Sequence, residues 1–159
     1  MLIELKEVPG MREAFKRSRS VILTTYNAEG ERHSRPMINY NEDPYKDIKF
    51  YTFTETRKVR DIKERSEAVI SFPSEQEGKV YRIKGFAKLA DSKMVSNEWE
   101  WWYLFYHPEK KPEWQLSGYG SYTDHRAIII VEPETASLEE IPSDYADLKD
   151  YEDLVNPEQ

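Results

Sequence analysis

The distribution of hydrophobic and polar residues along the chain predicts short strands joined by polar turns, with helices between them. Alternating or continuous apolar runs predict strands at 21–26, 33–40, 48–53, 68–72, 80–89 and 126–132. Helical spacing of apolar residues predicts helices at 11–17, 57–66 and 92–106. This order of hairpins and crossover helices favours a small closed barrel of mainly antiparallel strands with helices outside it.

Two residues inside the predicted strands indicate interruptions of the sheet. Pro36 has no backbone N–H, so we expect the strand at 33–40 to lie at an edge or a break of the sheet. Gly85 lies within the strand at 80–89, a position that is typical of a bulge or a bend.

Composition narrows the class of protein. With 159 residues and 38% hydrophobic residues, the chain can bury the core of one domain. It contains no cysteine, which excludes thiolate zinc sites, iron–sulfur clusters, disulfides and cysteine nucleophiles. The aliphatic run at 127–131 is far shorter than the ~20 residues of a membrane helix. Because the first residues also lack the pattern of a secretory signal, we expect a soluble cytoplasmic protein with no membrane partner.

The net charge of −7 is concentrated at one end of the chain. Residues 137–159 contain eight acidic residues and one lysine, so they carry this whole charge and residues 1–136 are neutral. We therefore divide the chain into a folded domain at 1–136 and a solvated acidic C-terminal extension at 137–159. A neutral body with an acidic tail argues against nucleic acid as a partner.

Basic residues at the predicted start of the helix 57–66 suggest a site for an anion. Arg57 and Lys58 follow a turn that contains Thr54 and Thr56, either of which can cap the helix. Cations are unfavourable at the positive end of a helix dipole, whereas a bound anion is favoured there by the free N–H groups. The segment 33–37 contributes Arg35, and arginine is suited to bind phosphate with two hydrogen bonds.

A charged helix face in solvent explains the same residues without any ligand. Arg57 and Asp61, or Arg60 and Glu64, are spaced to form ion pairs along one helix. Periodicity alone leaves both interpretations open.

Three segments of the chain resemble one known family. Residues 50–58, with FYT, then E, then TRK, resemble the flavin-phosphate segment F-Y-T-x-x-E-S-R-K of the pyridoxamine 5′-phosphate oxidase family. HSRPM at 33–37 and KVRDI at 58–62 are similar to the general-stress-protein branch of the same FMN-binding split-barrel superfamily. YRIKGFAKL at 81–89 is similar to a barrel strand of that superfamily. The resemblance covers about 10–90 well and 91–135 loosely.

The resemblance implies a homodimer of split β-barrels, mainly β with peripheral helices, and one FMN at each subunit boundary. By position, it implies that the phosphate is held by Arg35, Thr56, Arg57 and Lys58. It also implies that the backbone of Pro36 and Met37 follows the isoalloxazine edge, and that Tyr51 and Thr52 line the ribityl chain and the ring.

The chain departs from the family pattern at its C-terminal end. Pyridoxamine-phosphate oxidases end in a tryptophan-containing segment with R-L-x-P, whereas this chain ends in DYADLKDYEDLVNPEQ. Vitamin-pathway activity is therefore not expected, and the leading hypothesis is a flavin-dependent oxidoreductase acting on an unidentified small molecule. The alternatives are a non-catalytic flavin-binding or sensing protein, a split barrel that uses F420 or haem, and an interaction module with an empty barrel.

The remaining candidate residues have structural interpretations. The aromatic segment 98–106 is expected to pack in the core and at the dimer contact, although Trp102 or Trp114 could cover the flavin. The three histidines, His33, His107 and His125, lack the spacing of a metal site, and only His107 is considered as a haem ligand. We name no catalytic side chain, because a flavin carries its own redox chemistry.

Overall fold

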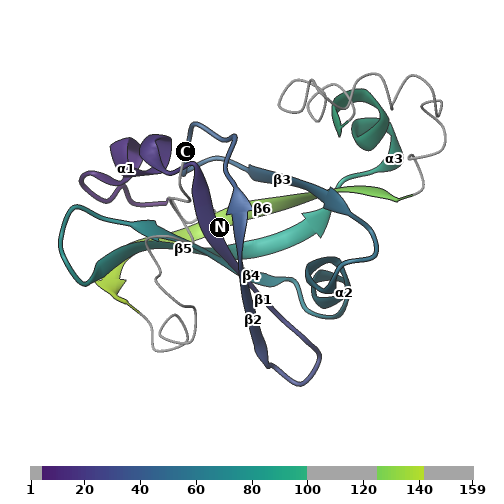
Figure 1. The fold of residues 1–159 in the computed structure, drawn as a ribbon, viewed down its shortest axis with the longest axis horizontal. Coiled ribbons are helices and arrows are strands. Elements are labelled where there is room, and N and C mark those ends of the chain that lie inside the picture. The colour runs from purple at the N-terminus through teal and green to yellow at the C-terminus, as the bar shows by residue number, and fades with distance from the viewer. Residues whose placement is uncertain (1–4, 100–124, 142–159) are drawn as a thin grey trace.

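A six-stranded sheet organises the part of the chain that this computed structural model describes, residues 5–99 and 125–141. The strands are β1 (Ser20–Tyr26), β2 (Arg32–Ile38), β3 (Ile48–Phe53), β4 (Glu67–Pro73), β5 (Lys79–Leu89) and β6 (Arg126–Glu140). Their order is β2-β1-β4-β5-β6-β3, and every pairing is antiparallel. The sheet curls into a half-barrel (Figure 1), which confirms the split-barrel architecture. The expectation of a closed barrel was wrong, because β2 and β3 remain the two edges of the sheet.

The edge position of β2 confirms what Pro36 predicted. Pro36 lies opposite Ile22 of β1, and its missing N–H is tolerated because, among the described strands, β2 pairs with β1 alone. A side chain links the segment after β2 to β3. The Asn41 amide donates to the Lys49 carbonyl at 2.9 Å and accepts from the Lys49 N–H at 2.8 Å. This link joins the two sheet edges at one end of the split.

Helices cover the sheet at separate places (Figure 1). They are α1 (Met11–Arg17), α2 (Arg57–Glu64), α3 (Ser92–Met94) and the π-helix η1 (Val95–Trp99). The helix predicted at 57–66 ends earlier, at Glu64, because Arg65 is extended with φ −148° and ψ 121°. The helix predicted at 92–106 begins where expected, and its residues 100–106 lie outside the described ranges.

The main core lies on the sheet face that contacts α1 and α2, which we call the inner face. It is formed by alternate residues of the strands, such as Val21, Leu23, Ile70 and Ile83, together with Phe15 of α1, Val59 and Ile62 of α2. Phe15 packs edge-on against Phe72 of β4, with 5.2 Å between ring centroids. A smaller core on the outer face joins Trp99 of η1 to Ile128 and Ile130 of β6.

A bulge in the β5–β6 pair explains why β6 is longer than predicted. The register shifts between Lys84 and Gly85, as the glycine suggested. A Cβ atom at position 85 would overlap the Glu132 carbonyl oxygen, so only glycine permits this approach. The shift carries the pairing past Pro133, and β6 continues to Glu140, which lies opposite Lys79. The apolar pattern breaks at Pro133, so the sequence indicated an end at Glu132.

Candidate functional site

The start of α2 has no acidic side chain and no side-chain cap. Thr56 occupies the N-cap position in an extended conformation, and it makes no capping hydrogen bond. Its hydroxyl donates instead to the Phe53 carbonyl at 3.0 Å, so the cap expected from Thr56 was wrong. The first helical bond runs from the Arg60 N–H to the Thr56 carbonyl. The three amides before Arg60 therefore have no partner within the helix.

Arg35 projects from β2 toward the inner face. Its guanidinium donates to the Leu23 carbonyl at 3.1 Å and to the Thr25 hydroxyl at 2.9 Å. Its side chain is 19% exposed. Burial lowers the pKa of Arg35 to about 10, against the opposing effect of Asp61, and the positive charge of Arg57 lowers it further. Arg35 is thus a mostly buried cation that remains protonated at neutral pH.

Lys58 and Arg57 of α2 share the electrostatic environment of Arg35. Burial is the main cause of the lowered pKa of the half-buried Lys58, and the positive charge of Arg35 lowers it further. Arg57 is exposed, yet its charge also acts on Arg35. The structure therefore brings together basic residues from two separate segments, and we call Arg35, Arg57 and Lys58 the cation cluster. This arrangement differs from the solvated helix face with Arg57–Asp61 pairing that periodicity had left open.

A buried carboxylate lies behind the cation cluster, and sequence reasoning missed its role. Asp61 of α2 accepts hydrogen bonds from the Thr25 hydroxyl at 2.7 Å and from His33 Nδ1 at 2.8 Å. One of its oxygens lies 3.9 Å from the Arg35 guanidinium. Asp61 directly precedes the buried Ile62, so its place beside the apolar stripe of α2 was the available signal.

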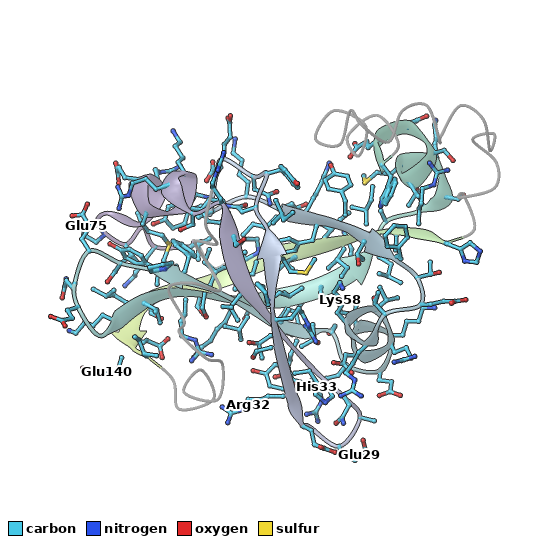
Figure 2. All side chains as sticks on the ribbon, in the orientation of Figure 1. Glu29, Arg32, His33, Lys58, Glu75 and Glu140 are labelled. Atoms are coloured by element: carbon cyan, nitrogen blue, oxygen red, sulfur yellow. The ribbon has the colours of Figure 1, made fainter. Side chains whose placement is uncertain are left out.

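The contact between α2 and the β1–β2 hairpin places these groups side by side. The Glu64 carboxylate accepts a hydrogen bond from the Ala28 N–H in the hairpin turn at 2.9 Å. In Figure 2, His33 lies where the hairpin passes α2, and Lys58 lies at the other side of that helix. Glu64 therefore ties the end of α2 to the hairpin that carries Arg35.

The other residues expected at the flavin lie on the two sheet edges. Pro36 is exposed on β2, and Met37 is half-buried against the main core. Thr52 of β3 is buried, and its carbonyl accepts a hydrogen bond from the Trp99 indole at 3.0 Å. Tyr51 packs on the outer face with the smaller core. Successive strand residues point to opposite faces, so the side chains of Tyr51 and Thr52 cannot line one surface together.

Tyr51 instead belongs to a polar contact with η1. Its hydroxyl donates to Glu98 at 3.4 Å, and Lys49 lies 3.2 Å from the same carboxylate. Burial, together with the negative charge of Glu98 and this hydrogen bond, raises the pKa of Tyr51 to about 12. Tyr51 is therefore neutral at physiological pH, and its hydroxyl helps to hold η1 on β3.

Metal and aromatic candidates fall partly outside the described ranges. Within 5–99 and 125–141, no three histidine, aspartate or glutamate side chains are grouped to hold a metal ion. Trp102, His107 and Trp114 lie outside those ranges. In the described part of the chain, no helix has the length and apolar character needed to span a membrane.

Comparisons with known proteins identify relatives of this fold. A family model described as "Pyridoxamine 5'-phosphate oxidase like" matches residues 6–116. No curated protein matches the chain. A solved structure from Clostridium acetobutylicum, of a protein related to general stress protein 26 of B. subtilis, has a TM-score of 0.60 and 17% identity, and the match covers 82% of this chain and 86% of that one.

Two further solved structures have the same fold and are named differently. HupZ of Group A Streptococcus has a TM-score of 0.58 and 14% identity, with 83% of this chain and 98% of that chain covered. A structure named "F420 Reductase" has a TM-score of 0.58 and 17% identity, with 82% and 98% covered. At these identities, the likeness establishes the fold alone.

Proposed function

The chain belongs to the pyridoxamine 5′-phosphate oxidase-like family, and from this premise we propose that it binds FMN and acts as a flavin-dependent oxidoreductase on a small molecule. The cation cluster and the first amides of α2 would hold the FMN phosphate. Pro36 and Met37 would lie along the ring, with Thr52 beside the ribityl chain. FMN supplies the redox chemistry when bound, and these residues bind and orient it.

The observation that carries the proposal is the imbalance of charge around the start of α2, where Arg35 is mostly buried, Lys58 is half-buried and Arg57 is exposed. Arg35, Arg57 and Lys58 carry three positive charges, and within residues 5–99 and 125–141 Asp61 is the carboxylate whose charge acts on Arg35. Burying cations without equal negative charge is unfavourable, as the lowered pKa values of Arg35 and Lys58 express. A phosphate monoester dianion would supply the two missing negative charges and would accept hydrogen bonds from the helix amides.

Thr56 would play a smaller part than the resemblance implied. Its hydroxyl proton is already donated to the Phe53 carbonyl, so a bond to phosphate requires that contact to break. The backbone amides at the start of α2 can donate without such a change.

We further propose that the protein is a cytoplasmic homodimer with the flavin at the subunit boundary. Exposed apolar side chains at the two sheet edges, Ile38 of β2 and Phe53 of β3, support a contact there, with exposed fractions of 51% and 42%. The barrel domain, expected to end at 136, would include the rest of β6 to Glu140, and the acidic extension would follow it. Sedimentation of the purified protein tests the dimer, and a monomer that retains flavin would contradict the boundary site.

The absorption spectrum of freshly purified protein tests the cofactor directly. Bands of oxidised flavin support FMN, whereas bands of a deazaflavin or a porphyrin favour F420 or haem instead. A colourless protein that takes up no added FMN rejects the proposal and favours an interaction module. Reduction of the bound flavin by NADH or NADPH then separates an oxidoreductase from a protein that only binds flavin.

The double variant Arg57→Ala/Lys58→Ala tests the phosphate contact. We expect it to lose bound FMN, because two phosphate-binding groups are removed at once. Arg60→Ala/Lys63→Ala is the matched control, since it removes the same charge from exposed positions of the same helix. Equal FMN content in the two variants would contradict the assignment.

A further inference from the structure

A chain of hydrogen bonds connects Arg35 to a buried carboxylate. The Thr25 hydroxyl accepts from Arg35 and donates to Asp61, and His33 Nδ1 contacts the same Asp61 oxygen. The Asp61 side chain is 4% exposed and Thr25 is fully buried. The network joins β1, β2 and α2 directly beneath the cation cluster.

The burial of the Asp61 carboxylate requires a physical explanation. Burying an ionised carboxylate is unfavourable by several kcal/mol unless charged and hydrogen-bonding partners compensate for it. Asp61 has such partners on two different strands, and it lies beyond the first turn of α2, where the helix dipole does not favour it. If its role were only to join α2 to the two strands by hydrogen bonds, a neutral side chain would be sufficient. The negative charge of Asp61 acts on Arg35, whose guanidinium lies 3.9 Å away and is itself mostly buried.

We propose that Asp61, with Thr25 and His33, is a positioning residue for Arg35: it fixes the guanidinium and leaves the cation cluster with the two positive charges that match a phosphate monoester dianion. This inference rests on the proposed function and deepens it. The hydrogen bonds to Leu23 and Thr25 hold Nη1 of the guanidinium, and Nη2 lies 3.9 Å from Asp61, beyond hydrogen-bond distance, so Nη2 and Nε would donate to a ligand. Asp61 itself would not touch the phosphate.

Comparing FMN with riboflavin isolates the phosphate contribution, since the two ligands differ only in that group. We expect Asp61→Asn to weaken FMN binding about tenfold, as loss of a partner behind a metal-binding group does. Riboflavin binding should not change. If Asp61 affected FMN only through its negative charge, Asp61→Asn would instead tighten FMN binding. If the substitution distorted the site in general, it would weaken the binding of both FMN and riboflavin. Either of these outcomes would overturn the positioning role.

A double-mutant cycle tests whether Asp61 acts through Arg35. In an Arg35→Ala background, we expect Asp61→Asn to have no further effect on the ratio of FMN to riboflavin affinity. An undiminished effect in that background would reject the proposal. Glu64→Gln is the matched control. It removes a carboxylate from the same helix, but this carboxylate contacts the hairpin turn and does not contact Arg35.

The failure of this inference differs from failure of the proposed function. A wild-type protein that binds FMN no better than riboflavin overturns the phosphate site and the inference together. A wild-type preference for FMN that persists in Asp61→Asn overturns the inference alone. If Asp61→Asn does not fold, Thr25→Val and His33→Gln remove the two other members of the network. Both should lower the preference for FMN, and unchanged preference in both would overturn the inference.

Discussion

Two groups of charged side chains on opposite faces of one sheet differ in how their charges are balanced. On the outer face, Arg82 and Lys84 of β5 lie 3.6 Å and 3.8 Å from the two carboxylate oxygens of Glu139. A hydrogen bond from Ser137 lowers the pKa of Glu139, and the two cations lower it further. On the inner face, burial dominates and the pKa values of Arg35 and Lys58 are lowered instead.

The difference separates a structural charge group from a candidate binding group. The outer group joins β5 to β6, and both of its cations lie close to the Glu139 carboxylate. The inner group has cations that repel one another, held near helix amides that also favour negative charge. The two groups are not distinguished by how many basic residues lie together. They are distinguished by the pKa shifts, which show the carboxylate stabilised on the outer face and the cations destabilised on the inner face.

The largest expected effect comes from removing Arg35, the arginine of the inner group. Arg35→Ala should weaken FMN binding about a hundredfold, because charge-assisted hydrogen bonds to phosphate contribute ~1.5–3 kcal/mol each. Arg82→Ala is the control, since the two side chains are similarly buried, with 19% and 15% exposed. Fluorescence titration with FMN measures both affinities. Similar losses in the two variants would mean that the charge balance does not identify the binding group.

Alkaline pH should weaken the inner group first. The pKa of Arg35 is lowered to about 10, so the free protein loses this charge above that pH. The ratio of FMN to riboflavin affinity should therefore be constant from about pH 8 to about pH 9, begin to fall as the pH approaches 10, and fall by up to about tenfold per pH unit above it. Riboflavin corrects for titration of the ring. A ratio that stays constant to about pH 11 would show that Arg35 does not contribute to binding.

The smallest expected effect is on stability without ligand. The pKa of Lys58 is lowered on folding, so at neutral pH, below both pKa values, its charge is unfavourable in the folded state. Lys58→Met should therefore raise the free energy of unfolding by a few tenths of a kcal/mol in phosphate-free buffer, within the usual range for partly exposed sites. Lys84→Met, which removes a contact to Glu139, should not raise it. Urea unfolding compares the variants, and destabilisation by Lys58→Met would show that this cation is already compensated.

The local elements followed from the sequence because each depends on neighbouring residues. Helix α1 and strand β3 have the predicted bounds, and Pro36 and Gly85 marked the edge and the bulge. The grouping of Arg57 and Lys58 on one helix start was likewise visible in the chain itself. These features arise from period, backbone geometry and side-chain type, which a short segment contains.

Tertiary structure alone decided how distant segments meet. It left the sheet open, carried β6 through the bulge to Glu140, and placed Tyr51 against η1 on the face opposite Thr52. It also brought His33 and Asp61 within hydrogen-bond distance across 28 residues of chain. Burial and the field of neighbouring charges depend on the packed arrangement of all these elements. For that reason the sequence could propose an anion site, while the balance of charge within it became visible only in the fold.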